Sequence, residues 1–369
     1  MRLAIILVHY HTPILAAEAA AALRLDMEKA GIEGEILLID NGSDPVGREI
    51  LASLPVRYID SGENLGYAGG VNLGVSSTEA EVVVLVNPDV LVLPGCLATL
   101  LAEIESGTDI AGPLFYWDRG CRLSLPPAEE RTRRGELLSL LAWRNEFWAL
   151  KARHSWRRAA RRHWEAPGAL PSYDLSGSLL ALRRSAWERV GPFDPAYRLF
   201  FEETDWLSRA RRAGLSARYV PAARAIHLYN QSAGLEPKTR EWFEASAERF
   251  RRQHYGTWFA TLLRGTAEVL PSPWEPTSPP LLPRAEKGLD LAGLGRDFPL
   301  WVEVSPNPTG FPAAAEKIVD PGCGVWRLPA EITAQYSGGG LVVQVTDAAG
   351  EEILRGSLPS RPAGEAGDL

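Results

Sequence analysis

The sequence is poor in cysteine and contains no long apolar run. Its three cysteines, Cys96, Cys121 and Cys323, lie far apart and form no C-x-x-C pair. A disulfide framework or a zinc site is therefore not expected, and a reducing cytoplasm fits best. No stretch approaches the roughly 18 consecutive apolar residues of a transmembrane helix. The apolar start, residues 1–10, is too short for a signal peptide and lacks a small-residue cleavage site, so we expect a buried first strand.

An excess of positive charge is also absent. The formal net charge of −7 over 369 residues argues against a general nucleic-acid binder, so no nucleic-acid partner is expected. A composition of 46% hydrophobic and 23% charged residues is typical of a soluble globular protein. The length allows one large domain or two ordinary ones, with a substantial core.

Short apolar runs alternate with helical patterns in the first half of the chain. Between the first two runs, Thr12-Pro13 and an Ala/Leu-rich stretch ending at Gly31 predict a helix with an N-cap, a proline start and a glycine stop. Strand–helix–strand units of this kind predict a doubly wound α/β sheet, in which ligands bind beyond the carboxyl ends of the strands. The predicted strands of this half are Leu3–Val8, Glu35–Asp40, Val56–Asp60 and Val82–Val86.

The composition changes along the chain and indicates its organisation. Proline is dense between 271 and 283, which predicts a linker rather than a packed element. Beyond it, short apolar runs among Gly and Pro predict strands at Leu300–Val304, Val325–Leu328 and Leu341–Val345. We therefore expect a large first domain at 1–265, a linker at 266–298, a small β-rich module at 299–356 and a disordered tail at 357–369.

A block at 129–165 interleaves ten Arg or Lys residues with four Trp residues, and we expect it to be an insertion in the first domain. Trp156, Ala160 and Trp164 recur at helical spacing. One interpretation is an amphipathic basic helix that lies on an anionic membrane surface, peripheral to the inner face of the membrane. The other is a solvated helix whose tryptophans pack on the core. The sequence leaves both open.

Several polar residues stand where predicted strands end. Asp89, in Asn87-Pro88-Asp89, follows the fourth strand, Asp40 ends the second, and His227 ends the run ARAIH. Each also has an ordinary explanation, since Asn-Pro and Asp form turns and a lone histidine is more often structural. The segment 64–74 (NLGYAGGVNLG) follows the third strand, and its glycines would let backbone amides approach a ligand.

Three acids lie within four residues in FFEETDW, ahead of an arginine-rich stretch that ends at Gly214. Acids at its start and cations at its end are typical of a helix. Helical spacing places Glu203 with Leu207 and Ala210 on an inward face, and it places Glu202 and Asp205 on an exposed face. An inward carboxylate near a cleft is a candidate general base.

Taken together, VHYHT, IDNGSD, ENLGYAGGVNLG, LVNPDV, DLSGSLLALRRSAWERVGPFD, FFEETDW and AIH resemble the family 2 glycosyltransferases of GT-A fold, especially the rhamnosyltransferase-like branch. The resemblance covers about residues 2–234 and implies a mixed doubly wound sheet flanked by helices. It implies that Glu203, where the family usually has aspartate, is the catalytic base. It also implies a metal site at Asp89, with His227 near the diphosphate, and donor contacts at His9, Tyr10, Asp40, Gly66, Gly70 and Asn72.

The resemblance implies an inverting enzyme that uses Mg²⁺ or Mn²⁺. It would move a sugar, with rhamnose favoured, from a dTDP-, UDP- or GDP-sugar to a glycan or lipid-linked acceptor in cell-surface polysaccharide synthesis. A hard cation that prefers oxygen ligands suits a departing diphosphate. Two alternatives remain at this point: a sugar-phosphate nucleotidylyltransferase, which would want a glycine-rich basic loop where this chain has HYHTP, and a non-catalytic glycan-binding protein.

Overall fold

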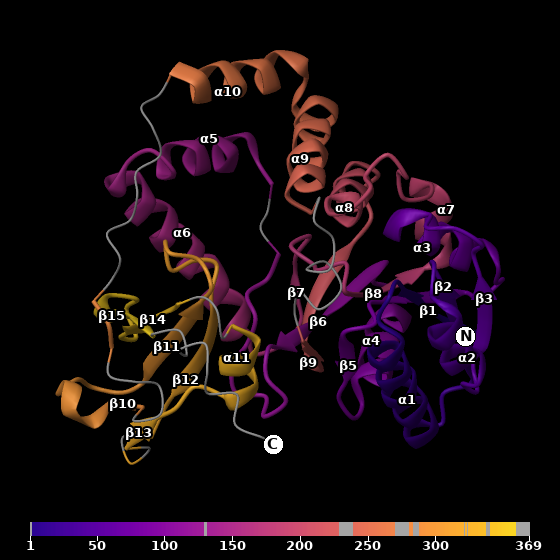
Figure 1. Cartoon of the computed structure of the whole chain (residues 1–369), viewed down its shortest axis with the longest axis horizontal. Coiled ribbons are helices and arrows are strands. Elements are labelled where there is room, and N and C mark those ends of the chain that lie inside the picture. Colours follow the sequence, from indigo (N-terminus) through magenta and orange to yellow (C-terminus); the bar gives the residue numbers. More distant parts are fainter. Residues whose placement is uncertain are drawn as a thin grey trace. The chain divides into compact units, whose positions relative to one another are not determined.

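The computed structural model describes residues 2–128, 131–228, 239–269, 280–282, 288–320, 322, 324–336 and 340–358. Within it the chain forms two compact units, each built from several segments (Figure 1). Unit 1 comprises Met1–Phe115, Pro127–Arg133 and Ala166–Thr266, and unit 2 comprises Tyr116–Pro126, Arg134–Glu165 and Ala267–Leu369. Among the described residues, no helix combines the length and the apolar character needed to cross a membrane.

Unit 1 is built on a mixed nine-stranded sheet in the order β3-β2-β1-β4-β8-β6-β9-β5, with β7 paired to β9. The first four strands of this order are parallel, and β8 joins β4 antiparallel. Every residue of β1 and β4 is buried, which explains their continuous apolar runs. The strands are β1 (Leu3–His9), β2 (Gly34–Asp40), β3 (Arg57–Asp60), β4 (Val82–Val86), β5 (Val90–Val92), β6 (Ile110–Tyr116), β7 (Leu170–Pro171), β8 (Leu179–Arg183) and β9 (Ala217–His227).

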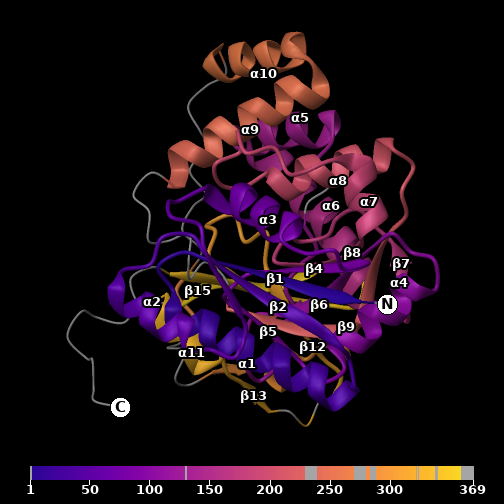
Figure 2. The ribbon, with the colours of Figure 1, turned by 90° about the vertical axis from the view of Figure 1, so that its right-hand side faces the viewer.

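Helices cover both faces of this sheet, as the second view shows (Figure 2). The predicted mixed α/β class is therefore confirmed, because β-α-β crossovers place helices on either side. The helices of this part of the chain are α1 (Pro13–Ala30), α2 (Pro45–Ala52), α3 (Gly66–Ser76), α4 (Cys96–Glu105), α7 (Arg184–Val190), α8 (Glu202–Arg212), α9 (Thr239–Tyr255) and α10 (Thr257–Val269).

The first helix begins and ends where the sequence predicts, but its start differs in one respect. Gly31 closes α1 in the left-handed conformation at φ 65°. The side chain of Thr12, however, forms no capping hydrogen bond to the helix. Its Oγ1 lies 3.2 Å from Nδ1 of His9. The hydroxyl thus orients a histidine at the carboxyl end of β1 instead of capping α1.

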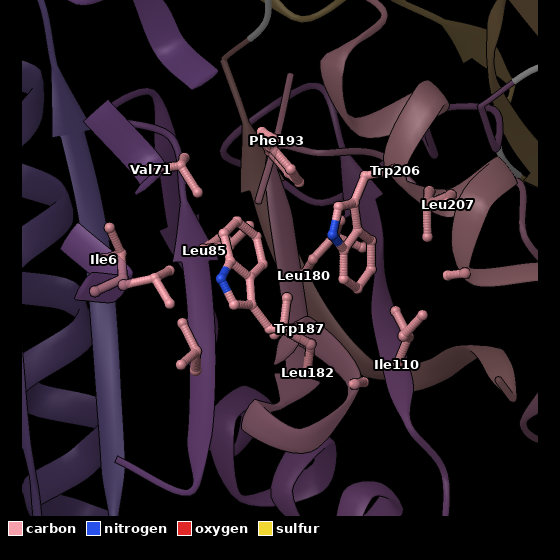
Figure 3. Close-up of a cluster of buried hydrophobic side chains, with 14 of the residues drawn as sticks. Ile6, Val71, Leu85, Ile110, Leu180, Leu182, Trp187, Phe193, Trp206 and Leu207 are labelled. Carbon is pink, nitrogen blue, oxygen red and sulfur yellow. The ribbon is translucent and has the colours of Figure 1, made fainter. Parts of the chain in front are cut away.

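An aromatic cluster fills the space between the sheet and helices α7 and α8 (Figure 3). The rings of Trp187 and Trp206 stack with centroids 5.7 Å apart, and Phe193 packs against both. Nε1 of Trp206 donates to the carbonyl of Gly191 at 2.8 Å. Because these large side chains are buried and locked in place, the start of α8 is held firmly against the sheet.

Unit 2 contains the β-rich module that the sequence predicts near the C-terminus, as an antiparallel sheet in the order β12-β11-β14-β15 and a separate β10–β13 pair. Two stretches of the expected linker, 270–279 and 283–287, and the tail beyond 358 lie outside the described residues, whereas β10 lies within the linker's predicted range. The elements are α5 (Arg133–Ala142), α6 (Glu146–Trp164), β10 (Leu289–Asp290), η2 (Ala292–Leu294), β11 (Leu300–Ser305), β12 (Ala314–Ile318), β13 (Val325–Trp326), α11 (Ala330–Gln335), β14 (Leu341–Thr346) and β15 (Glu352–Leu358).

Most of the basic, tryptophan-rich block, residues 134–165, belongs to unit 2, whereas we expected the block as an insertion in the first domain. One face of α6 packs on the β-rich module. Arg157 and Glu303, both buried, form a two-point ion pair with N···O distances of 2.7 and 2.9 Å. Trp164 stacks on Trp301 at 5.5 Å between ring centroids. For this face of the helix, the interpretation of tryptophans packed on a core is the one that the structure supports.

Candidate active site

The carboxyl ends of β1 and β2 meet at one edge of the sheet, where His9 pairs in register with Asp40. Both side chains are buried. Nε2 of His9 lies 2.9 Å from Oγ of Ser43. Burial lowers the pKa of His9 to about 4, so the imidazole is neutral at neutral pH. Tyr10 lies next along the chain, with its ring edge 3.7 Å from where a Cβ on Gly42 would be.

The carboxylate of Asp40 organises the loop that follows β2. It accepts hydrogen bonds from the amides of Gly42 and Ser43 at 3.1 and 2.8 Å, and from the hydroxyl of Tyr58 at 2.6 Å. Burial raises the pKa of Asp40, but the hydrogen bonds from Tyr58 and Ser43 outweigh it and hold the pKa below its ordinary value. Asp40 is therefore ionised and shapes the pocket edge through Tyr58 and these amides.

The glycine-rich segment forms the start of α3. Gly66 begins the helix at φ 71°, a conformation that favours glycine, and its amide donates to Asn64. At Gly70 a Cβ would lie 2.7 Å from Cγ1 of Val8, so glycine lets α3 pack closely on β1. The residue before the helix, Leu65, supplies no side-chain cap. Amides of the first turn thus point to the edge where an anionic group would be favoured.

Two asparagines near the glycine-rich segment, of which only Asn72 was predicted, are fixed by contacts within the protein. Asn72 donates from Nδ2 to the carbonyl of Phe193 at 2.9 Å and accepts from its amide at 3.0 Å. This pairing ties α3 to the segment before α8. Asn41, which sequence reasoning missed, holds the glycine-rich loop, because its amide group bonds the backbone of Leu65 and Gly66. The only hint of this role was its place directly after a strand end.

Asp89, in the turn between β4 and β5, and His227, at the end of β9, come together in the structure. Oδ1 of Asp89 lies 3.5 Å from Nε2 of His227, and both side chains are largely shielded from solvent. The amide of Leu228 donates to the carbonyl of Asp89 at 2.9 Å, which fixes β9 beside the Asn-Pro-Asp turn. The ring of Phe115 packs against His227 at 5.6 Å between centroids. Tertiary structure thus unites two residues 138 positions apart, the difference between 227 and 89.

This pair suits a divalent cation that is completed by substrate. Adjacent ligands that lie about 2.1 Å from an octahedral ion are ~3.0 Å apart, so Asp89 and His227, at 3.5 Å, would have to approach each other by ~0.5 Å to bind one ion. No group of three or more His, Cys, Asp or Glu side chains is placed to hold a metal anywhere in the described part of the chain. Asp89 and His227 would therefore hold an ion only together with oxygens from a bound phosphate and water.

One short segment, residues 176–178, connects this pair to the acids of α8. Oγ of Ser178 lies 3.4 Å from Nε2 of His227. Gly177 packs against Glu203 so closely that a Cβ there would lie 2.8 Å from Cγ of the glutamate. The hydroxyl of Tyr67 donates to the carbonyl of Gly177 at 2.9 Å. Sequence reasoning did not single out Gly177 or Tyr67, although the SGS triplet before a strand was visible.

The three acids of α8 differ from the predicted arrangement. Glu202 and Asp205 are buried, so their placement on an exposed face was wrong. Asp205 accepts hydrogen bonds from Arg209 at 2.8 Å and from Nε2 of His254 at 2.7 Å, and it thereby joins α8 to α9. Glu203 is partly buried against Gly177. The exposed-face prediction failed because α9 and its neighbours cover a side of α8 that the helix pattern leaves polar.

The electrostatic setting favours Glu203 as a base. Burial, and then the adjacent charge of Glu203, raise the pKa of Glu202 well above its ordinary value. Burial also raises the pKa of Glu203, and backbone amides at the start of α8 and the charge of Arg131 offset part of this rise. Because the two carboxyls repel each other when both are ionised, the pair keeps one proton to a higher pH than an isolated glutamate would, and the other carboxylate is available as a base.

The backbone immediately before these acids is strained. Phe200 and Phe201 both adopt positive φ angles, of 65° and 70°, which bulky residues rarely do. The ring of Phe201 is buried against Phe250, with Arg131 above it at 5.0 Å. Strain of this kind persists only where surrounding contacts enforce it, and it clusters at functional sites. Here it sets the direction in which α8 presents Glu203.

Comparisons with known proteins find glycosyltransferases among the relatives of this chain. The family described as Glycosyl transferase family 2 matches residues 21–165. An N-acetylglucosaminyl-diphospho-decaprenol L-rhamnosyltransferase of Mycobacterium tuberculosis is 32% identical over 248 residues, which are 63% of this chain and 78% of that protein. The low-salt glycan biosynthesis hexosyltransferase Agl10 of Haloferax volcanii is 25% identical over 198 residues, which are 52% of this chain and 58% of Agl10.

Among solved structures, the mannosyltransferase PcManGT from Pyrobaculum calidifontis, in complex with GDP-Man and Mn²⁺, matches with a TM-score of 0.42 and 14% identity. The match covers 73% of this chain and 76% of that chain.

Proposed function

The chain belongs to the family 2 glycosyltransferases, and we propose that it is an inverting enzyme that transfers a sugar from a nucleotide-diphosphate donor to a lipid-linked acceptor. The relative from Mycobacterium tuberculosis, named as a rhamnosyltransferase acting on a diphospho-decaprenol, supports this class of acceptor and favours rhamnose from a dTDP donor. UDP- and GDP-sugars are the alternative donors. A cytoplasmic location stays a prediction.

The observation that carries the proposal is the placement of residues 176–178 between two different groups. On one side Ser178 lies beside His227 and hence beside Asp89. On the other side Gly177 touches Glu203. In the proposed site, one short segment would thus hold both the residues that bind the diphosphate and the single base for an acceptor hydroxyl. One phosphate site and one base suit direct displacement at a sugar carbon.

In the proposed reaction, Glu203 accepts the proton of the acceptor hydroxyl as its oxygen attacks the anomeric carbon. The new carbon–oxygen bond forms while the bond from that carbon to the diphosphate breaks, so the anomeric configuration inverts. Asp89 and His227 would hold Mg²⁺ or Mn²⁺, which when bound neutralises the charge on the departing diphosphate. The first turn of α3, whose N-cap residue Leu65 supplies no side-chain cap, and the loop at Asp40 would bind the donor's anionic and base portions.

Transfer assays test the proposal directly. The protein would be incubated with dTDP-rhamnose, UDP-sugars or GDP-sugars, a polyprenyl-diphosphate-linked N-acetylglucosamine acceptor, and Mg²⁺ or Mn²⁺. Mass spectrometry would identify the product and NMR its anomeric configuration. We expect transfer from one donor with inversion. Retention of configuration would overturn the mechanism, and failure of every donor to be transferred or hydrolysed would overturn the function.

The raised pKa of Glu203 predicts the acidic limb of the pH–rate profile. A base works only when it is deprotonated, and burial raises the pKa of this carboxyl above that of an ordinary glutamate. The turnover number should therefore fall as pH decreases through a value above about 4.3, the pKa of a free glutamate side chain. Stopped transfer assays across pH would measure this limb. A limb at the free-glutamate value would show that Glu203 is not the group that titrates.

Gly177 offers a second test, because a side chain there would displace the base. In Gly177→Ala the new Cβ would overlap Cγ of Glu203, and a shift of about 1 Å in a catalytic group can cost 10²-fold in rate. We expect turnover to fall by about this factor while donor affinity stays near wild type. Gly168→Ala is the matched control, since a Cβ there meets nothing within 4 Å. Equal turnover in the two variants would contradict the packing of Glu203 on this segment.

A further inference from the structure

Helices α5 and α6 follow each other directly in the chain (Figure 1), and large apolar side chains are exposed in both and between them. Trp143 and Phe147 are 62% and 57% exposed. Isolated apolar residues on a surface are normal, but a gathering of them marks an interaction site. We refer to the following set as the α5–α6 tip: Leu137, Trp143, Phe147, Trp148 and Leu150.

The basic side chains on the two faces of α6 have different surroundings. On the inner face, Arg153, Arg157 and Arg161 are buried and bind partners in β11, β14, β15 and the turn at 348–350. On the outer face, residues spaced seven and four apart, two turns and then one turn of the helix, are exposed and cationic. We refer to Lys151, Arg158 and Arg162 as the outer stripe. It continues the line of Phe147, over whose ring Nζ of Lys151 lies at 4.9 Å.

The charge of this surface opposes that of the chain as a whole. The formal net charge is −7, whereas the outer stripe is cationic. Between residues 134 and 165, all of which are described, the exposed acids are Glu146 and Glu165, at the two ends of α6. Glu165 is already paired with Lys317. A localised positive strip on an acidic protein is complementary to an anionic partner.

We propose that the α5–α6 tip and the outer stripe form a docking surface for the anionic face of a lipid bilayer. Tryptophan and phenylalanine side chains are favoured at the level of lipid headgroups, where one side of the ring is apolar and the other is wet. Lysine and arginine beside them contact acidic headgroups while their stems lie along apolar surface. The inner face of α6 is occupied by the β-rich module, so the helix would lie on the membrane with its outer face.

Vesicle flotation with the whole protein tests this proposal. Vesicles would contain phosphatidylglycerol and phosphatidylcholine, or phosphatidylcholine alone, at low and high salt. We expect binding to the anionic vesicles that weakens as the salt concentration rises, because salt screens the attraction between basic side chains and acidic lipids. Absence of binding at low salt, or equal binding to both kinds of vesicle, would overturn the proposal.

Charge reversal of the outer stripe should abolish this binding. Each basic residue near an anionic surface contributes about 1 kcal/mol, so loss of three should lower the partition constant by roughly 10²-fold. Reversal adds repulsion, which can only increase the loss. The test variant combines Lys151→Glu, Arg158→Glu and Arg162→Glu. The matched control makes the same change in charge at exposed sites on other elements, with Arg240→Glu, Arg296→Glu and Arg327→Glu.

A second pair of variants separates insertion from charge. Trp143→Ala with Phe147→Ala removes apolar area while leaving every charge, and we expect it to weaken binding in both low and high salt. The control, Ile14→Ala with Leu25→Ala, removes exposed apolar groups from α1. Equal losses in test and control for either pair would overturn the proposal. Vesicle binding that survives in both test variants would also overturn the proposal. If the wild-type protein binds no vesicles but self-associates, and the test variants lose this self-association, the occupant of the surface is a second copy of the chain.

Discussion

Replacing Glu203 with glutamine is expected to lower the rate of sugar transfer by about 10²–10⁴-fold, the usual contribution of a positioned general base. Glutamine keeps the size of the side chain and its packing on Gly177 but cannot accept a proton. Donor binding should hardly change, because the base acts on the acceptor. Steady-state kinetics with saturating donor, together with calorimetric titration of nucleoside diphosphate, would measure the two effects separately.

Two comparisons show whether the effect belongs to Glu203. Glu248→Gln, on the exposed side of α9, is the control and should leave transfer unchanged. Normal turnover of the Glu203 variant with an inactive Glu202→Gln or Asp205→Asn would identify a different acid as the base. Asp205→Asn needs a stability measurement beside it, because Asp205 is buried and paired with Arg209 and His254. Breaking one partner from a buried charge network can cost about 3–5 kcal/mol.

The conservative variant Glu203→Asp tests whether the length of the side chain at this position matters for transfer. It introduces the residue that the family usually carries, and it should retain activity well above that of the glutamine variant if the backbone places it as in the family. The side chain is one methylene shorter and loses part of its contact with Gly177. Activity no better than that of Glu203→Gln would mean that the reach of glutamate is essential in this chain.

Replacing Asp89 with alanine is expected to abolish metal-dependent binding of the nucleoside diphosphate. Only His227 would remain as a protein ligand, and a hard cation binds oxygen ligands in preference to an isolated imidazole. Calorimetry with the diphosphate, with and without Mn²⁺, would measure the loss. We expect wild-type affinity to depend on the ion and the variant's weaker affinity not to depend on it.

Asp297→Ala serves as the control, since Asp297 is an exposed carboxylate in unit 2. We expect the Asp89 variant to remain folded. Because Asp89 is buried beside His227, thermal unfolding would check this. Wild-type affinity of Asp89→Ala in the presence of Mn²⁺ would show that the metal assignment is wrong. If the Asp89→Ala variant loses binding only because it unfolds, its melting temperature will be lowered. In that case Asp89→Asn would be tested in place of Asp89→Ala.

Strands of the first half could be predicted from sequence because a strand that is buried on both faces is a continuous run of apolar residues. Leu3–Val8 and Val82–Val86 are continuous apolar runs, and the structure has β1 and β4 there, fully buried. The short strand β5 (Val90–Val92) escaped prediction, because three residues carry too little pattern. Strand β9 runs from Ala217 to His227, and the run ARAIH in the sequence indicates only its end, since Pro221 and Arg224 interrupt its apolar pattern.

The site was partly predictable for a related reason. In a doubly wound sheet, residues that end parallel strands must meet at one edge, so the proximity of Asp40 and His9 could be predicted from the sequence. Nothing local reports that Gly177 would touch Glu203, or that Ser178 would lie beside His227. Those contacts depend on antiparallel pairing of β8 with β4, which no periodicity in the sequence specifies.

The sequence by itself determined the sheet class, the first helix, the residues at the strand ends and the family resemblance, because each depends on short-range pattern or on ordered motifs. Only the tertiary structure decided which acids of α8 are covered, and which cations of α6 are buried. Arg157 and Arg158 are adjacent and identical in type, yet Arg157 is buried against Glu303 and Arg158 faces solvent. A helix pattern separates its two faces, but the neighbouring elements decide which face becomes the interior.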